Sequence, residues 1–357
     1  MKKTILSVLG ISVLMVGCHN GDVDFPDYEY QTIYFAKQTP IRTVTLGDDG
    51  DFDTSLDNQH IIEIKAALGG VNENRKEHSA AFVVDNTLCD RIQFSDGREI
   101  KPMPANYYTI SGDRMVIHKG AVIGGVQVHL SDAYFADPLS VDVNYVIPLL
   151  LTSSNDSILS GAPKDGVVNP DRLNVNDWSI LPKDYILYAV KYKNPYHGVW
   201  LSKGVDVLEH RGETKTDDRI VEFWEKASLR ELSTISLTRS RYSFNYAVPT
   251  IAADGSNSEK NIAIDLYLDI DDNGNCKITT ETPGCTASGS GKWTHKGEPK
   301  AWGDKDRDLI ELDYTFNIEY VYNDATGEKA NYKMTTKENL VMRDRQNKLE
   351  EFSFVMK

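Results

Sequence analysis

Short runs of partly alternating apolar and polar residues dominate the first half of the chain. Residues 30–36, 60–66 and 125–130 are typical, since they combine β-branched and aromatic side chains with polar positions between them. Such alternation indicates strands with one buried face and one solvated face. Turn-forming clusters, such as residues 47–51 (Gly-Asp-Asp-Gly-Asp), separate these runs at short spacing. The pattern predicts an antiparallel β-sandwich of the immunoglobulin type over residues 29–160.

The second half of the chain repeats the β pattern after a polar segment. Residues 152–183 are rich in Ser, Asn, Asp, Gly and Pro, and we place a linker or loop at 161–184. A new series of alternating runs begins at Tyr185, and around eight such strands closing on themselves would form an up-and-down barrel. The predicted fold class is therefore all-β, with an antiparallel barrel over 185–357.

The first residues have the features of a lipoprotein signal peptide. Two lysines precede an apolar run, residues 5–16, that is too short to span a bilayer, which takes about 20 residues. The run closes on a Gly-Cys pair, so we expect removal of residues 1–17 and lipidation of Cys18. An ordinary secretory signal with an unmodified cysteine is the alternative. The acidic segment 18–28 would be a flexible tether, and it resembles the tags of surface-exported lipoproteins of the Bacteroides type.

Composition narrows the classes of partner. The 357 residues include 53 acidic and 39 basic side chains, a formal net charge of −14 that would repel nucleic acid. The 5 tryptophans and 18 tyrosines suit either aromatic-rich β cores or platforms for carbohydrate. Cys276 and Cys285 would form either a disulfide across a hairpin or two free thiols. No histidine or cysteine spacing predicts a metal site, and no cofactor motif is present.

Both halves resemble known families. Residues 82–151 resemble domain of unknown function 1735, which is common in Bacteroides-type surface lipoproteins and stands in front of some endoglycosidases. The likeness is carried by five short segments: 84–86 (Val-Asp-Asn), 104–108 (Pro-Ala-Asn-Tyr-Tyr), 125–128 (Gly-Val-Gln-Val), 145–149 (Tyr-Val-Ile-Pro-Leu) and 158–161 (Ile-Leu-Ser-Gly). The part from Asn194 onward resembles a calycin-type barrel, and Gly198-Val199-Trp200 matches the Gly-x-Trp that opens a lipocalin barrel. The resemblance implies glycan capture with outer-membrane uptake components, without naming a sugar.

One acidic segment has the spacing of a calcium loop. Asp269, Asp271 and Asn273 precede Gly274, as in the first half of such a loop, but position twelve is Thr280 and not a bidentate Glu. Asn-Gly alone is a strong hairpin signal, so we favour a turn. The endoglycosidase relatives place their catalytic Glu in a similar motif, and an amide such as Asn273 cannot donate that proton. With no other catalytic signature present, the chain is expected not to be an enzyme.

Aromatic residues in the C-terminal half of the chain provide the candidate binding site. Two tryptophans flank a polar loop at 296–300, and the candidates are Trp293, His295, Trp302 and Asp304. An exposed indole stacks on the apolar face of a sugar ring, while neighbouring polar groups bond its hydroxyls. Tyr242 would line the barrel mouth. The alternative for each tryptophan is packing at a barrel end.

These observations support one main hypothesis and two alternatives. The main hypothesis is a lipid-anchored protein of the outer membrane, exposed at the cell surface, that binds carbohydrate without catalysis. The alternatives are a structural lipoprotein that binds a protein partner, and a barrel that holds a small apolar ligand.

Overall fold

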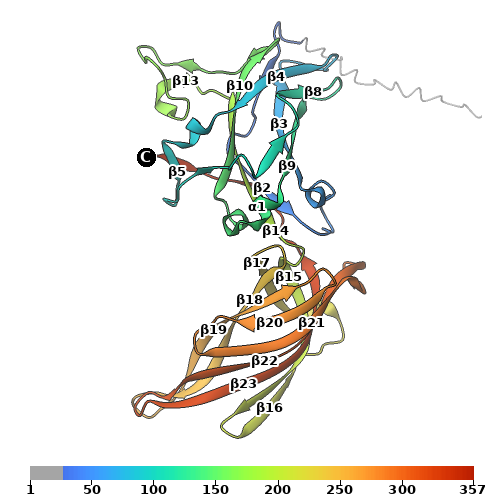
Figure 1. Cartoon of the computed structure of the whole chain (residues 1–357), viewed down its shortest axis with the longest axis vertical. Helices are drawn as coiled ribbons and strands as arrows, with labels where there is room; N and C mark the ends of the chain where they lie inside the picture. The colour runs from blue at the N-terminus through green and yellow to red at the C-terminus, as the bar shows by residue number, and fades with distance from the viewer. Residues whose placement is uncertain (1–26) are drawn as a thin grey trace, which may run out of the picture.

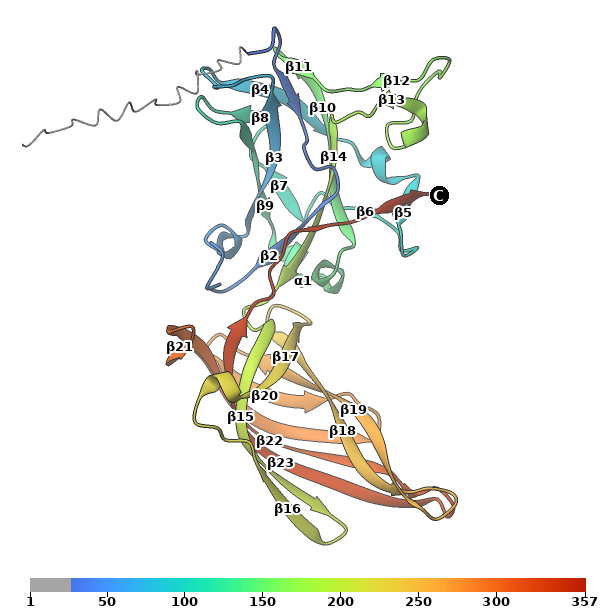
Figure 2. The ribbon, with the colours of Figure 1, turned by 180° about the vertical axis from the view of Figure 1, so that it is seen from behind.

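The computed structural model describes residues 27–357 as two all-β domains stacked end to end (Figures 1 and 2). The predicted all-β fold class is confirmed. Cys18 and the predicted signal peptide lie outside the described residues, so lipidation stays a prediction. Within the described part of the chain, no helix has the length and apolar character that crossing a membrane requires.

The N-terminal domain is a β-sandwich of short strands. Its strands are β1 (Thr32–Tyr34), β2 (Pro40–Thr45), β3 (Ile61–Gly69), β4 (His78–Val84), β5 (Ile92–Phe94), β6 (Lys101–Pro102), β7 (Tyr108–Ile110), β8 (Arg114–Ile117), β9 (Ile123–Leu130), β10 (Tyr145–Ser154), β11 (Ser157–Ile158), β12 (Ala162–Pro163), β13 (Trp178–Ile180), β14 (Tyr185–Lys193), β24 (Glu350–Glu351) and β25 (Phe354–Met356). Its short helices are η1 (Asp57–Gln59), η2 (Asn86–Cys89), α1 (Asp132–Ala136), η3 (Pro138–Val141) and η4 (Val175–Asp177).

Most of these strands belong to one hydrogen-bonded network that surrounds a common core. The strand order is β11-β1-β3-β9-β8-β4-β10-β14-β2-β24, and β14 runs parallel to β2. The alternating strands predicted at 60–66 and 125–130 are confirmed as β3 and β9, which pair with each other. Their inward residues, such as Ile62, Ile64 and Val128, are fully or almost fully buried. The immunoglobulin type of the sandwich remains a prediction.

The structure corrects the predicted domain boundary at Tyr185. Strand β14, at 185–193, lies in the N-terminal sheet between β10 and β2 and not in the barrel. Its residues are apolar without interruption from Tyr185 to Val190, because both faces of the strand are buried. Strands β24 and β25 also return to the N-terminal domain, since β24 pairs with β2 and β25 pairs with β5. The barrel therefore occupies only the chain between these segments.

The predicted linker at 161–184 is a folded excursion of the N-terminal domain. Strands β12 and β13 pair with each other, and the Trp178 indole N–H donates to the carbonyl oxygen of Asp171 at 2.7 Å. The Arg172 guanidinium forms two hydrogen bonds to the buried carboxylate of Asp184, at 2.9 and 3.0 Å. The sequence pattern missed this structure because polar side chains, rather than an apolar face, hold it together.

The C-terminal domain is a closed antiparallel barrel. Its strands are β15 (Gly198–His210), β16 (Glu213–Asp218), β17 (Ser228–Thr234), β18 (Arg239–Ile251), β19 (Asn257–Ile270), β20 (Asn275–Thr280), β21 (Cys285–Trp302), β22 (Lys305–Asn323) and β23 (Glu328–Asp344), with a short helix η5 (Trp224–Lys226). The nine-stranded sheet closes because β15 pairs with both β17 and β23. From Ile264 to the end of β19, and from Ile310 to Tyr320 in β22, every second side chain is buried in the interior. The lipocalin type of this barrel remains a prediction.

The Gly-x-Trp sequence lies where β15 enters the barrel. Trp200 is fully buried, and its indole N–H donates to the carbonyl oxygen of Tyr196 at 3.0 Å. Gly198 has φ +145°, and a Cβ there would lie 2.4 Å from the carbonyl oxygen of Asp344 on β23. This close approach of two backbones requires glycine. Trp200 therefore fills the domain-facing end of the barrel.

Two crossings of the chain, at 194–197 and 345–349, join the domains. At the second, the buried Arg345 guanidinium donates to the carbonyl oxygens of Leu46 at 2.9 Å and Asn194 at 2.7 Å. These bonds tie a turn of the N-terminal domain to both crossings. The side-chain amide of Asn194 donates in turn to the backbone of the β17–β18 turn, at Ser236 and Arg239. Buried hydrogen bonds of this kind hold the domains in one relative position.

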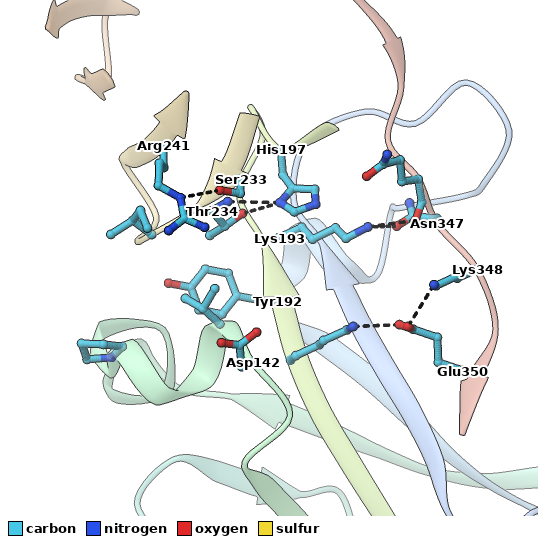
Figure 3. A pocket seen from close by; sticks show the side chains of 15 residues that line it. Asp142, Tyr192, Lys193, His197, Ser233, Thr234, Arg241, Asn347, Lys348 and Glu350 are labelled. Atoms are coloured by element: carbon cyan, nitrogen blue, oxygen red, sulfur yellow. Dashed lines mark hydrogen bonds and ion pairs between the residues drawn. The ribbon is translucent and has the colours of Figure 1, made fainter. Parts of the chain in front are cut away.

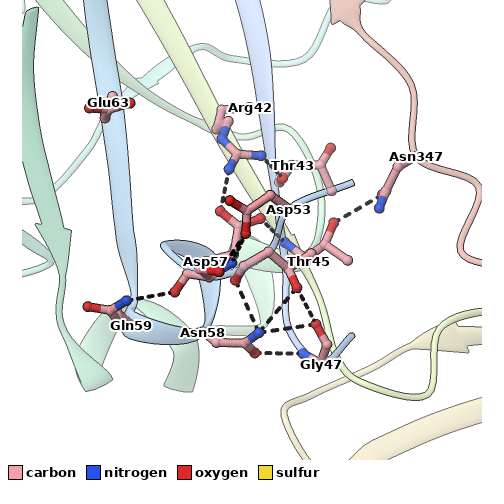
Figure 4. Close-up of polar contacts among 12 residues, drawn as sticks. Arg42, Thr43, Thr45, Gly47, Asp53, Asp57, Asn58, Gln59, Glu63 and Asn347 are labelled. Atoms are coloured by element: carbon pink, nitrogen blue, oxygen red, sulfur yellow. Dashed lines mark hydrogen bonds and ion pairs between the residues drawn. The ribbon is translucent and has the colours of Figure 1, made fainter. Parts of the chain in front are cut away.

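Figure 4 shows the polar network on the N-terminal side of this junction. The buried carboxylate of Asp57 accepts the backbone N–H of Thr45 at 2.8 Å and pairs with Arg42. Burial raises the pKa of Asp57, against the opposing effects of Arg42 and the Thr45 N–H. The Thr45 hydroxyl donates to the side chain of Asn347 at 3.0 Å, which links this network to the second crossing.

Candidate functional site

Residues 296–300, predicted to be a polar loop, are instead part of a long hairpin. Strand β21 continues to Trp302, and β22 begins at Lys305. The pairing shifts register between Thr294 and Trp302, and Lys296 and Lys300 adopt left-handed φ values of 50° and 49°. Such shifts are β-bulges. Because a bulge interrupts the alternation of inward and outward side chains, a search for alternating residues does not detect this part of the strand.

The two candidate tryptophans of this hairpin face different regions. The Trp293 ring lies edge-on to Tyr196, with centroids 5.5 Å apart, and packs against the barrel core. Trp302 packs on an outer apolar cluster, and the Arg343 guanidinium lies 5.1 Å from its ring centroid. The structure therefore does not bring these two indoles together as one sugar platform. The alternative of packing at a barrel end describes Trp293.

The other candidates are also separated. His295 lies between Asp308, at 3.0 Å, and Asp48 of the N-terminal domain, at 3.4 Å, while Asp304 is exposed at the hairpin turn. Tyr242 is not at the barrel mouth. It is 1% exposed, and its hydroxyl donates to Glu338 at 3.0 Å inside the barrel.

The calcium-like segment is a hairpin turn, as favoured from the sequence. Asp271 accepts the backbone N–H groups of Asn273 at 2.9 Å and Asn275 at 2.8 Å, and Gly274 has φ +78°. Asp269 instead pairs with Arg239 at 3.0 Å. The two carboxylates that a calcium site would need are therefore occupied, Asp271 by backbone N–H groups of the turn and Asp269 by Arg239.

Cys276 and Cys285 are free thiols, not a disulfide. Cys276 on β20 lies opposite Gly291, while Cys285 begins β21, about 20 Å along that strand at the usual rise per residue. A disulfide requires Cα atoms within about 7 Å. Burial raises the pKa of Cys276 to about 12, so this thiol is not reactive near neutral pH.

A hollow lies between the two domains (Figure 3). This junction cleft has a volume of about 770 Å³, within the range of small-molecule sites. One wall comes from the barrel, the second from the end of β14 and from η3 with the residue after it, and the third from the second crossing and the start of β24. Clefts between domains are preferred positions for ligands.

The barrel wall of the cleft is built on strand β17. Thr234 points into the barrel, where its backbone N–H donates to Nδ1 of His197 at 3.1 Å. Since Nδ1 accepts this bond, the ring proton lies on Nε2. Burial, with smaller effects from Lys193 and Arg345, lowers the pKa of His197 to about 3, so the ring is neutral at physiological pH. The adjacent Ser233 alternates to the cleft side, where Arg241 of β18 donates to its hydroxyl at 3.4 Å.

The opposite walls combine apolar side chains with charges. Tyr192 is almost fully buried and donates its hydroxyl to the carbonyl oxygen of Phe135 at 3.1 Å, so its ring acts as floor and not as an exposed platform. Lys193 donates to the carbonyl oxygens of Arg345 and Gln346, both at 3.0 Å. These bonds fix the third wall against β14.

A second hollow lies on the outer surface of the barrel. This barrel groove has a volume of about 620 Å³ and is bordered by the half-buried Trp224. The Lys203 ammonium lies 4.2 Å from the centroid of the Trp224 ring, and the indole N–H donates to Glu298 at 3.1 Å. The groove floor includes Glu311 and Asn339, which lie in register with Lys203 across adjacent strands. One face of the indole is therefore covered by a cation.

The sequence indicated little of either hollow. The cleft residues come from four distant segments that share no motif, although His197 stands in the turn before the Gly-x-Trp sequence. For Trp224, the only signal is an aromatic pair, Phe223-Trp224, between charged residues. Such a pair does not distinguish a strand from the loop and short helix that the structure shows.

Comparison with known proteins places the chain in a family. A solved structure from Bacteroides ovatus, of unknown function, is 40% identical and superimposes with a TM-score of 0.80. The alignment covers 93% of this chain and 100% of that chain. This chain belongs to the family of that protein. The family model for the domain of unknown function DUF5627 matches residues 195–346, which are the barrel as the structure bounds it.

Other matches add no argument about function. A second family model, described as "-like, N-terminal domain", matches residues 28–158. A multidomain protein including DUF1735 from Bacteroides ovatus, at 11% identity, covers 89% of this chain and 97% of that chain with a TM-score of 0.37. An auxiliary nutrient binding protein from Bacteroides thetaiotaomicron, at 10% identity, covers 87% of this chain and 95% of that chain with the same score. No curated protein matches the chain.

Proposed function

We propose that this chain is a non-catalytic carbohydrate-binding protein whose site is the junction cleft. Cys18 would carry the lipid, and the acidic tether would hold the two domains at the outer-membrane surface, beside components of glycan uptake. The predicted mechanism of stacking on Trp293 and Trp302 is replaced by one of hydrogen bonds in a rigid cleft, because those indoles are packed against the barrel.

The observation that supports this function is a set of polar groups that face the cleft without partners of their own. Within residues 27–357, the side chains of Asp142 and Gln346 have no hydrogen-bond partner, although both line the cleft. Asp142 offers an acceptor, and Gln346 offers both a donor and an acceptor. Pro138, Val141 and Ile235 supply apolar patches. Hydroxyls and C–H faces of a sugar require this mixture.

Rigidity supports the same function. The walls are fixed by the buried bonds of Arg345, Lys193 and Asn194, so a ligand would not have to order them. Preorganised walls reduce the entropic cost of binding a polar ligand, which gains little from apolar burial. A scaffold of strands is also better suited to this than a mobile loop.

The test is glycan binding by the soluble form from Asp22 onward, with two matched variants. We expect Asp142→Ala to weaken binding about tenfold or more, because a hydrogen bond to a charged group contributes about 1.5–3 kcal/mol. Asp304→Ala removes another exposed carboxylate, from the hairpin turn, and should leave affinity unchanged.

Three results would contradict the proposal in different ways. Binding lost in Asp304→Ala but kept in Asp142→Ala would move the site to the hairpin predicted from sequence. Binding lost on substitution of Trp224 alone would move it to the barrel groove. No binding to any glycan would reject carbohydrate capture and favour a protein partner, to be sought by pull-down from the outer membrane.

A further inference from the structure

The junction cleft differs in charge from the rest of the molecule. The chain has a formal net charge of −14, yet the cleft is lined by four cationic side chains against two carboxylates. The cations are Lys191, Lys193, Arg241 and Lys348, and the carboxylates are Asp142 and Glu350. They come from both domains and from the second crossing, so the folded chain brings these charges together where the domains meet.

Internal pairing leaves most of this positive charge uncompensated. Glu350 is shared between Lys191 at 2.7 Å and Lys348 at 3.5 Å, so one carboxylate faces two ammonium groups. Lys193 donates to carbonyl oxygens, which are neutral. Among the described residues, the Arg241 side chain donates a hydrogen bond only to the hydroxyl of Ser233, at 3.4 Å. The guanidinium of Arg241 therefore keeps most of its donors for a ligand.

The titration of neighbouring groups agrees with a positive local potential. Burial and then the charges of Lys191 and Arg345 lower the pKa of Lys193 to about 8. Burial first, followed by the charges of Lys193, Arg345 and Lys191, also lowers the pKa of His197. At neutral pH Lys193 is still largely protonated, so the positive potential is present under physiological conditions.

We infer that the junction cleft binds an acidic sugar, in which a carboxylate or sulfate group is held by the Arg241 guanidinium, while Lys193 and Lys348 add positive charge on the other side of the cleft (Figure 3). This inference rests on the proposed function and names its ligand class. A guanidinium has planar donors that match the two oxygens of such a group, and an ammonium adds charge without directional demand. Asp142 and Gln346 then bond hydroxyls on the neutral part of the same sugar chain, away from the anionic group. The negative surface elsewhere repels acidic glycans and leaves the cleft as their site.

The experiment compares acidic glycans with neutral counterparts of the same backbone. The probes are oligogalacturonate and its methyl ester, and a carrageenan oligosaccharide and its desulfated form, titrated calorimetrically into the soluble form from Asp22 onward. We expect at least one acidic probe to bind about tenfold or more tightly than its neutral counterpart. Raising salt from about 0.15 M to about 1 M should reduce that preference, because the Debye length shortens from ~8 to ~3 Å. The two pairs distinguish carboxylate from sulfate.

Matched variants locate the preference. Arg241→Gln should remove most of it, so that the acidic probe binds about as weakly as its neutral counterpart. The control Arg211→Gln makes the same charge change at the β15–β16 turn, where Arg211 pairs with Glu328, and should have no effect. Circular dichroism and thermal unfolding of both variants check that the fold is kept.

The outcomes separate this inference from the proposed function. Neutral and acidic probes that bind equally, with loss in Asp142→Ala, would overturn the acidic preference and keep carbohydrate binding in the cleft. An acidic preference that survives Arg241→Gln would overturn the assignment to this cleft. Failure of every probe of both classes to bind would overturn both.

Discussion

Two arginines have largely buried side chains, Arg219 inside the barrel and Arg345 at the junction, and they bind different kinds of acceptor. Arg219 meets carboxylates: its guanidinium donates to Asp206 at 2.7 and 3.1 Å and to Glu338 at 3.3 Å. Burial alone would lower the pKa of Arg219, but the hydrogen bond to Asp206 and the charges of Glu338 and Asp206 raise it. The barrel therefore surrounds this internal cation with carboxylates of its own.

Arg345 at the junction meets carbonyl oxygens instead. It is 4% exposed, and burial lowers its pKa to about 10, although Asp49, Asp308 and Asp48 act against this. The carbonyl oxygens of Leu46 and Asn194 are neutral acceptors for its Nη2 and do not cancel its charge, while the buried Nε has no partner among the described residues. The comparison indicates that Arg219 stabilises one domain, whereas Arg345 connects two and adds to the positive potential beside the cleft.

The largest effect is expected for Arg219→Met. This change leaves Glu338, whose side chain is fully buried, and Asp206 without their cation. Breaking a buried pair in this way costs about 3–5 kcal/mol, to be measured as the free energy of unfolding of the barrel in denaturant. Arg211→Met breaks an exposed pair with Glu328 and should cost less than about 1 kcal/mol. Equal effects of the two variants would mean that the interior ion pair stabilises the fold no more than a surface ion pair does.

A smaller effect is expected for Arg345→Met. The carbonyl oxygens of Leu46 and Asn194 lose their donor, but a buried charge is also removed, so we expect a loss of about 2–3 kcal/mol. Because the bonds join domains, the two domains should also unfold in separate steps. Arg343→Met, which removes only the contact with Trp302, is the control and should cost about 0.5–1 kcal/mol. A single unchanged transition in Arg345→Met would show that other contacts hold the junction.

The sequence predicted those parts of the fold that depend on local patterning. Strands such as β3, β9 and β19 follow from apolar alternation. Alternation of apolar and polar residues indicates a strand that is buried on one face only. Because β14 is buried on both faces, this pattern did not assign it to its sheet. Nor does it detect β21, whose bulges at Lys296 and Lys300 break the period.

The candidate site was less accessible to prediction for a different reason. Asp142, Lys193, Arg241 and Gln346 are brought together only because β14 and the 345–349 crossing return to the same junction. No local sequence feature marks such residues, since each is an ordinary polar residue in its own segment. The tryptophans, which local chemistry did mark, are used for packing.

His197 allows the junction to be tested by pH. Its pKa of about 3 lies below the ordinary value of 6.5, so between these values the unfolded state binds more protons than the folded state. The stability that neutral His197 provides is present above pH 6.5 and is lost as pH falls toward 3. Between pH 6.5 and pH 5 the loss is about 2 kcal/mol. His197→Asn, whose side-chain oxygen can accept the Thr234 N–H, should remove this part of the acid sensitivity. An identical pH profile for variant and parent would show that His197 is not held neutral.

The smallest effect is expected at the rim of the same junction. Lys296 of the hairpin pairs with Asp48 of the N-terminal domain at 2.9 Å, but both side chains are 54% exposed. The hydrogen bond from Lys296 lowers the pKa of Asp48, yet water screens a pair at this exposure. Lys296→Ala should therefore cost less than about 1 kcal/mol, and the difference should disappear at about 1 M salt. If Lys296→Ala instead cost as much as Arg345→Met and separated the unfolding of the two domains, surface charge rather than the buried arginine would hold the cleft walls in place. The rigidity that the proposed site requires would then depend on ionic strength.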